Sequence, residues 1–176
     1  MLKRQIPEVI FKVRVRDESI VGDNPYRWQD LSSNEVFENK KILIFSLPGA
    51  FTPTCSTFQL PGFEELYFKF KEKGIDEIYC ISVNDSFVMN AWVKEQGIKN
   101  VKVLPDGSGE FSRKMGMLVL KDNLGFGYRS WRYAAFVKDK TVEMWFEEPG
   151  FSDNCPEDPY GSTKPENILE AISLNV

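Results

Sequence analysis

Two continuous apolar runs stand out in the middle of the chain. The segment KKILIFSLP, residues 40–48, is rich in β-branched and aromatic residues and closes on Pro-Gly, and GIDEIYCISVND, residues 74–85, has a similar character. Such runs, bounded by turn residues, predict buried strands. A short strand is predicted from Val101, and residues 132–146 predict two strands joined at a turn over residues 138–140.

Apolar residues recur at helical spacing between these runs. Phe63, Leu66 and Phe70 predict a helix that starts near Cys55, and Pro61 inside it is expected to kink the helix because proline donates no backbone hydrogen bond. Residues 86–97 predict a second helix, with Ser86 as its cap and Gly97 as its stop. A further short helix is expected before Met117.

The chain is expected to end in one more helix. Thr163 and Glu166 have the spacing of a capping box, Pro165 lies in the first turn, and the apolar face consists of Ile168, Leu169 and Ile172. The order strand-helix-strand-helix, then hairpin, then helix predicts an α/β fold with a central mixed β-sheet flanked by helices on both faces. The 176 residues fit one domain spanning 1–176.

Composition and charge exclude several functional classes. A formal net charge of −4 and a pI near 5.1 argue against a nucleic-acid-binding protein, which would carry a basic face. No apolar run approaches the roughly 20 residues of a membrane helix, and the N-terminus lacks the apolar stretch of a signal peptide. We therefore expect a cytoplasmic protein with neither membrane nor nucleic acid as a partner.

The residue types available for chemistry are restricted. The chain has no histidine, which excludes Ser-His-Asp triads, Cys-His dyads and most zinc sites. Three cysteines are an odd number, they form no CxxC motif, and no glycine-rich phosphate-binding motif is present. Reduced thiols in a reducing compartment are the expected state of these cysteines.

Cys55 has the most reactive position of the three. It follows a predicted central strand and begins a helix, at the edge of the sheet where ligands collect in such folds. Free N–H groups and the positive end of the helix dipole favour its thiolate, and without histidine the counter-charge must come from Lys or Arg. Cys80 lies within an apolar strand and is expected to be a buried structural residue.

These residues resemble those of a known family. Pro48, Thr52 and Cys55 form Pro-x-x-x-Thr-x-x-Cys, the signature of peroxiredoxins, and LPGAFTPTCS followed by LPGF is similar to the peroxiredoxin-5 subfamily. The resemblance covers nearly the whole chain, because later blocks of that subfamily appear in order at Ser82 to Trp92, Leu104 to Met117 and Arg129 to Val137.

The resemblance implies a thioredoxin-like fold and a thiol peroxidase acting on hydrogen peroxide and alkyl hydroperoxides. Cys55 would be the peroxidatic cysteine, which becomes a sulfenic acid. Thr52 would hydrogen-bond the peroxide or the thiolate, Arg132 would stabilise the developing charge, and Pro48 would shield the site. No metal or organic cofactor is implied, and a homodimer is expected.

Arg129 and Gln59 lie close in sequence to Arg132 and Cys55. Arg129 lies three residues before Arg132, so on an extended strand its side chain is expected to point to the opposite face. Gln59 stands where many relatives are expected to have histidine. Glutamine can form hydrogen bonds but cannot titrate near neutral pH, so a role for this position in proton transfer is in doubt.

Cys155 decides how the oxidised enzyme would be reduced. It lies in GFSDNCPEDPYGS, residues 150–162, a predicted loop in which Asp153, Glu157 and Asp158 disfavour its thiolate. It is either a resolving cysteine, with thioredoxin as the reductant, or an exposed thiol with no role in turnover. In the second case glutathione or glutaredoxin reduces Cys55 directly.

Two other functional classes remain open at this point. A redox sensor would pass oxidation from Cys55 to a partner protein, with turnover incidental. A thioredoxin-like binding module with an inactive site is disfavoured by the complete set of Pro48, Thr52, Cys55 and Arg132.

Overall fold

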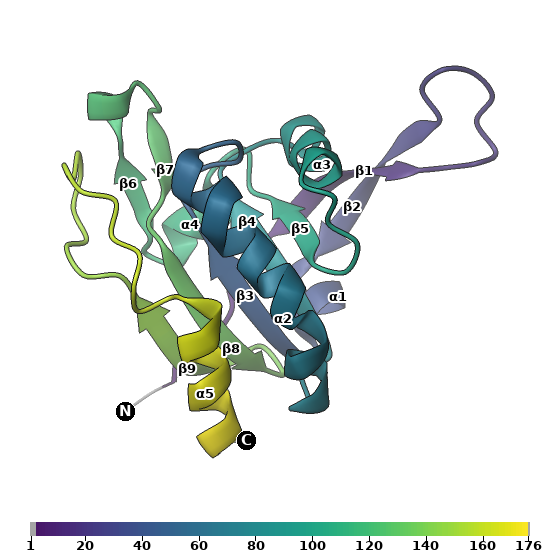
Figure 1. The fold of residues 1–176 in the computed structure, drawn as a ribbon. Helices are drawn as coiled ribbons and strands as arrows, with labels where there is room; N and C mark the ends of the chain where they lie inside the picture. The colour runs from purple at the N-terminus through teal and green to yellow at the C-terminus, as the bar shows by residue number, and fades with distance from the viewer. Residues whose placement is uncertain (1–2, 176) are drawn as a thin grey trace.

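A five-stranded mixed sheet forms the centre of the molecule. The computed structural model describes residues 3–175. The strand order is β5-β4-β3-β8-β9, with β3, β4 and β5 parallel and with β8 and β9 antiparallel to their neighbours (Figure 1). This confirms the predicted mixed sheet, whose strands are β3 (Lys41–Ser46), β4 (Glu77–Ser82), β5 (Lys102–Pro105), β8 (Tyr133–Lys138) and β9 (Thr141–Glu147).

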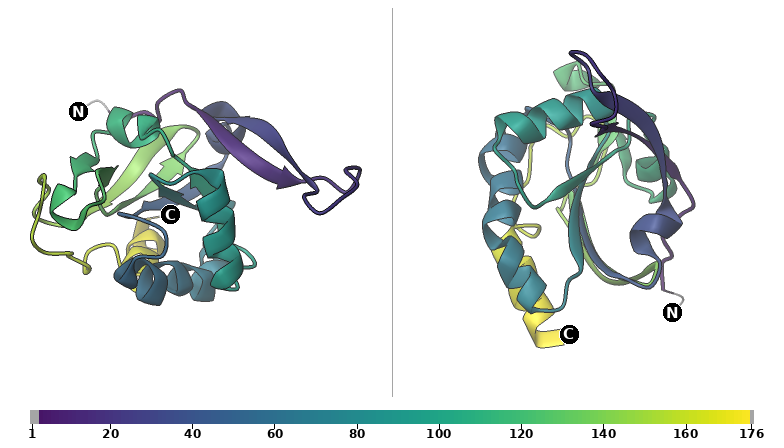
Figure 2. Two further views of the ribbon diagram at one scale, coloured as in Figure 1. Left: turned by 90° about the horizontal axis from the view of Figure 1, so that it is seen from above. Right: turned by 90° about the vertical axis from the view of Figure 1, so that its right-hand side faces the viewer.

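Helices cover both faces of this sheet, as predicted (Figure 2). Side chains on β3 alternate between the two faces, so that Leu43 and Phe45 join one apolar cluster and Ile42 and Ile44 join the other. The first cluster also contains side chains of α2 (Leu60–Glu72), α3 (Ser86–Glu95) and α5 (Pro165–Asn175). The second contains side chains of α1 (Ser33–Phe37) and α4 (Glu110–Lys114).

Two small antiparallel sheets were not predicted. β1 (Ile10–Arg16) pairs with β2 (Tyr26–Ser32) and forms an arm that extends away from the central sheet (Figure 1). β6 (Leu118–Leu120) pairs with β7 (Tyr128–Ser130), and a short 3₁₀ helix (Asp122–Leu124) lies between them. The second sheet matters for function because β7 leads directly to Arg132.

Both predicted helix caps were assigned to the wrong residue. Asp85, not Ser86, caps α3: its side chain accepts a hydrogen bond from Val88 N at 2.9 Å, while Ser86 Oγ accepts one from Arg14 N. Gly97 has φ of 65° and follows the end of α3, as predicted. At the C-terminus, Thr163 forms no capping box with Glu166, because it donates its backbone N–H to the buried carboxylate of Glu148.

The remaining features of the C-terminal helix are as predicted. α5 begins at Pro165, and Ile168 and Ile172 are fully buried against the sheet. The longest helix described between residues 3 and 175 is α2, with 13 residues. No helix in that range has the length and apolar character needed to cross a membrane.

Candidate active site

Cys55 lies in a distorted helical turn at the carboxyl end of β3. The helical hydrogen bonds begin with Ser56 N donating to Thr52 O at 3.0 Å, and Cys55–Gln59 then form a π-helical turn that continues into α2. The distortion expected at Pro61 therefore takes the form of a wider turn just before it, with Pro61 as the second residue of α2. Such turns occur frequently at functional sites.

The guanidinium of Arg132 provides the positive charge beside Cys55. Both side chains are buried, with exposed fractions of 0% for Cys55 and 2% for Arg132. Arg132 Nη1 lies 3.5 Å from Cys55 Sγ, and the same nitrogen donates to Gln59 Oε1. Burial alone would lower the pKa of Arg132, but the negative charges of Cys55 and Asp158 more than offset it, and the pKa is raised. Arg132 is therefore a permanent cation at the sulfur.

Asp158 is a partner of Arg132 that the sequence analysis missed. Its Oδ1 accepts a hydrogen bond from Arg132 Nη2 at 2.6 Å, across 26 residues of sequence. The ring of Tyr160 lies under the guanidinium, 5.6 Å from Cζ, and also faces Phe58 at a centroid distance of 6.3 Å. In the sequence, Asp158 stands out only as an acidic neighbour of Cys155, and no local spacing connects it to Arg132.

Thr52 and Pro48 both lie in the loop that leads to Cys55. Thr52 is half-buried and donates its hydroxyl proton to Gly49 O at 2.7 Å. Pro48 is buried, and its carbonyl oxygen accepts a hydrogen bond from Arg129 Nη1 at 3.1 Å. The structure thus brings Pro48 and Thr52 together on one side of the Cys55 turn and Arg132 next to the sulfur.

The predicted orientation of Arg129 was wrong. Arg129 donates a hydrogen bond to the Pro48 carbonyl in the loop before Cys55. Burial lowers the pKa of Arg129, and the negative charge of Cys55 offsets part of this lowering. Residue alternation does not apply here, because Trp131 and Arg132 lie between β7 and β8 and belong to neither strand. Both arginines consequently face the Cys55 side of the molecule.

The loop before Cys55 is closely fitted to its neighbours. A Cβ atom on Gly49 would clash with Arg129 Nη1, so a larger residue here would displace the end of the Arg129 side chain. Ala50 N donates to Asn84 Oδ1 at 3.0 Å, which links the loop after β3 to the loop after β4. Phe51 has a left-handed backbone with φ of 64°, a conformation that costs energy in a bulky residue.

The other two cysteines lie in different apolar clusters. Cys80 is fully buried in the cluster that contains Cys55. Burial raises the pKa of its thiol, and the nearby negative charge of Cys55 raises it further. Its predicted core position is confirmed. Cys155 is 6% exposed and belongs to the cluster on the opposite face of the sheet. The expectation of an exposed Cys155 thiol was therefore wrong, because this part of the loop packs against the second core.

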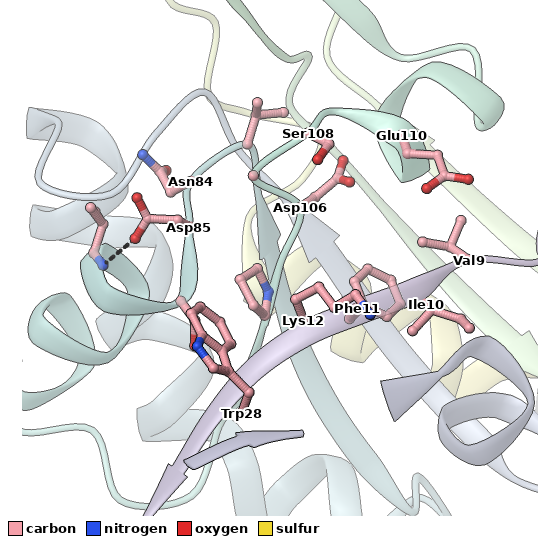
Figure 3. Close-up of a pocket in the computed structure, with 15 residues that line it drawn as sticks. Val9, Ile10, Phe11, Lys12, Trp28, Asn84, Asp85, Asp106, Ser108 and Glu110 are labelled. Atoms are coloured by element: carbon pink, nitrogen blue, oxygen red, sulfur yellow. Dashed lines mark hydrogen bonds between the residues drawn. The ribbon is translucent and has the colours of Figure 1, made fainter. Parts of the chain in front are cut away.

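A pocket of about 420 Å³ opens beside β1, between the loops that follow β4 and β5 (Figure 3). Its lining includes neither Cys55 nor Arg132. Its carboxylates have structural partners: Asp85 caps α3, and Asp106 accepts hydrogen bonds from Phe111 N and Ser112 N. Among residues 3–175, no group of three or more acidic or cysteine side chains is placed to hold a metal ion.

Comparison with known proteins identifies the family. The Redoxin family model matches residues 27–154. A peroxiredoxin of Rhizobium etli is 66% identical over 171 residues, which are 97% of this chain and 96% of that protein.

Solved structures agree with this match. The Plasmodium falciparum antioxidant protein, a 1-Cys peroxiredoxin, has a TM-score of 0.90 and 39% identity, covering 99% of this chain and 100% of that one. Peroxiredoxin 5 from Alvinella pompejana has a TM-score of 0.76 and 28% identity, covering 99% of each chain. The chain therefore belongs to the peroxiredoxins, thiol peroxidases with a thioredoxin-like fold.

Proposed function

We propose that Cys55 is the peroxidatic cysteine of this enzyme and that it reduces hydrogen peroxide and alkyl hydroperoxides. The observation that carries the proposal is the buried guanidinium of Arg132, 3.5 Å from Cys55 Sγ. The thiolate attacks one peroxide oxygen and the O–O bond breaks. The sulfur is oxidised to sulfenic acid, and the other oxygen takes a proton and leaves as water or alcohol.

The neighbouring residues have distinct proposed roles. Arg132 favours the thiolate and stabilises the negative charge that develops on the leaving oxygen. Thr52 already donates to Gly49 O, so its hydroxyl oxygen can accept a hydrogen bond from the peroxide. Pro48 fixes the loop through its carbonyl contact with Arg129 and shields the sulfur from water. The electron pair that breaks the O–O bond comes from the Cys55 sulfur, and the proton that the leaving oxygen takes comes from water.

We propose that glutathione or glutaredoxin reduces the oxidised Cys55. The placement of Cys155 supports this, because its side chain packs in the core on the opposite face of the sheet from Cys55. The acidic side chains Asp153 and Asp158 bind other groups, Leu120 N and Arg132, so burial in the opposite core is the feature that separates Cys155 from Cys55. Resolution by Cys155, with thioredoxin as the reductant, would require that segment to leave its core position.

We further propose that the chain forms a homodimer through the surface around this site. Exposed apolar side chains lie on three neighbouring segments: the loop after β3, the start of α3 and the β6–β7 sheet. Hydrogen bonds join the loop after β3 to Asn84, just before α3, and to Arg129 of β7. They are Phe51, Phe87, Leu124 and Tyr128, each between 49% and 62% exposed. Burial of such a group between two copies would remove this apolar surface from water.

The experiment that tests the catalytic proposal follows hydrogen peroxide consumption with glutathione and glutaredoxin as reductants. Cys55→Ser is expected to abolish turnover with the fold intact, whereas Cys155→Ser is expected to keep it. Turnover by Cys55→Ser would refute the assignment of Cys55. Loss of turnover in Cys155→Ser, with thioredoxin required by the wild type, would replace the glutaredoxin route with a resolving cysteine.

A further inference from the structure

The segment that joins β9 to α5, residues 149–164, is held to the molecule at both ends; we call it the strap. Near its start, Asp153 and Asn154 bond to the backbone of Leu120 at 2.8 and 2.7 Å. Near its end, the buried carboxylate of Glu148 accepts hydrogen bonds from three consecutive backbone N–H groups of the strap, those of Gly161, Ser162 and Thr163. The residues between these anchors pass over Arg132.

Asp158 lies in this central part of the strap and binds Nη2, the terminal nitrogen of the guanidinium that does not contact the sulfur. Arg132 Nη1 is directed to Cys55 Sγ and Gln59 Oε1, while Arg132 Nη2 is directed to Asp158 Oδ1 at 2.6 Å. The arginine is buried but the Asp158 side chain is 48% exposed. The ion pair therefore connects a buried catalytic cation to a residue at the surface.

The third guanidinium nitrogen of Arg132, Nε, makes no hydrogen bond within residues 3–175 that would help to orient the side chain. Nε is buried and has no hydrogen-bond partner among the described residues. A guanidinium has a rigid fork of donors, so fixing Nη2 also fixes the direction of Nη1. Of the two side chains that bind its terminal nitrogens besides Cys55, Gln59 is neutral and Asp158 is charged.

We propose that Asp158 is a positioning residue for the peroxidase reaction: it orients Arg132 so that Nη1 faces the sulfur of Cys55. The inference rests on the proposed function of Cys55 and Arg132. Asp158 does not itself reach the sulfur or the peroxide. Its effect on the reaction passes through the arginine, and the strap anchors hold it where the arginine can be bound.

Two roles of Asp158 predict opposite results, which makes the inference testable. If Asp158 were only a nearby negative charge, Asp158→Ala would favour the thiolate, and half of Cys55 would ionise at a lower pH than in the wild type. If Asp158 positions Arg132, Asp158→Ala removes the acceptor of the Nη2 hydrogen bond and the arginine loses its orientation. Half-ionisation of Cys55 then moves to higher pH, and the rate constant for reaction with hydrogen peroxide falls on the order of 10- to 100-fold.

The experiment measures both quantities by stopped-flow fluorescence and by the pH dependence of thiol alkylation. Glu157→Ala is the matched control, since Glu157 is the exposed neighbour with the same charge and has no described contact with Arg132. It is expected to behave as the wild type. Asp158→Glu is expected to recover part of the lost rate, because it restores a carboxylate acceptor.

A second comparison separates positioning from a general loss of structure. In an Arg132→Met background, Asp158→Ala is expected to change the rate constant by less than about twofold, since the residue through which Asp158 acts is gone. An unchanged rate in Asp158→Ala alone, or half-ionisation of Cys55 at lower pH, would overturn the inference while leaving the wild-type reaction intact. A wild type with no Cys55-dependent reaction would instead refute the proposed function.

Discussion

At the scale of single residues, Arg132 supplies the positive charge beside the thiol, which histidine supplies in Cys-His pairs. Its partners Cys55, Gln59 and Asp158 come from two separate parts of the chain and enclose one guanidinium. The carboxylate of Asp158 binds Nη2, whereas Nη1 meets, among the described residues, only the neutral Gln59 and the sulfur, so an anion at the sulfur is favoured on that side of the guanidinium. The absence of histidine from the sequence had already required that this charge come from arginine or lysine.

Residue environment also separates the three thiols. Burial raises the pKa of Cys80 well above its ordinary value, so its thiol stays protonated at pH 7 to 8. Native protein treated briefly with iodoacetamide at that pH is expected to carry the label on Cys55 and not on Cys80. Peptide mapping by mass spectrometry reads the result, with urea-unfolded protein as the control in which all three cysteines react. Native labelling of Cys80 ahead of Cys55 would contradict this description of the core.

At the scale of elements, two irregular segments build the site on a regular sheet. The π-helical turn Cys55–Gln59 presents the sulfur and Gln59 to Arg132 from one side. The strap presents Asp158 from the other side. Neither segment is held by a β-ladder, so side-chain anchors such as Glu148 must fix the geometry of the strap.

Glu148 is accordingly expected to stabilise the strap. Its removal leaves three backbone N–H groups without their acceptor, and hydrogen bonds to a buried charge contribute about 1.5–3 kcal/mol. Glu148→Ala should lower the free energy of unfolding by about 3 kcal/mol and slow the peroxide reaction. Urea denaturation measures the first effect. Glu147→Ala, at an exposed neighbouring position, is the control, and equal stability of the two variants would contradict the anchor.

At the scale of the whole molecule, the sequence predicted the sheet and its covering helices well. Continuous apolar runs such as residues 40–48 and 74–85 have one stable arrangement, which is burial between layers. The small sheets β1–β2 and β6–β7 were missed, because their strands are short or carry alternating charges and depend on tertiary contacts.

The site was predicted in part, for a related physical reason. Cys55, Thr52 and Pro48 form a local motif, and Arg132 was carried by the family resemblance. The orientation of Arg129, the contact of Asp158 and the burial of Cys155 depend on where loops cross in space. Sequence spacing contains no information about such crossings, so these three features had to come from the structure.

The proposed dimer is a property of the whole molecule and has its own test. Phe51→Asp places a charge in the apolar surface, at a left-handed position that aspartate tolerates. The variant is expected to weaken self-association by about tenfold or more. Sedimentation equilibrium should show the wild type at twice the chain mass of 20.3 kDa. Phe68→Asp, at an exposed position on α2, should leave the dimer intact, and a monomeric wild type would refute the proposal.

The role of Cys55 is tested by the intact mass of fully reduced protein after one equivalent of hydrogen peroxide, with no reductant present. We expect the wild-type protein to gain one oxygen atom, trapped by a sulfenic-acid reagent on the peptide that contains Cys55, and Cys55→Ser to gain none. Oxygen on another residue, or an unchanged mass in the wild type, would contradict the claim that the Cys55 thiolate beside Arg132 is the group that reduces peroxide.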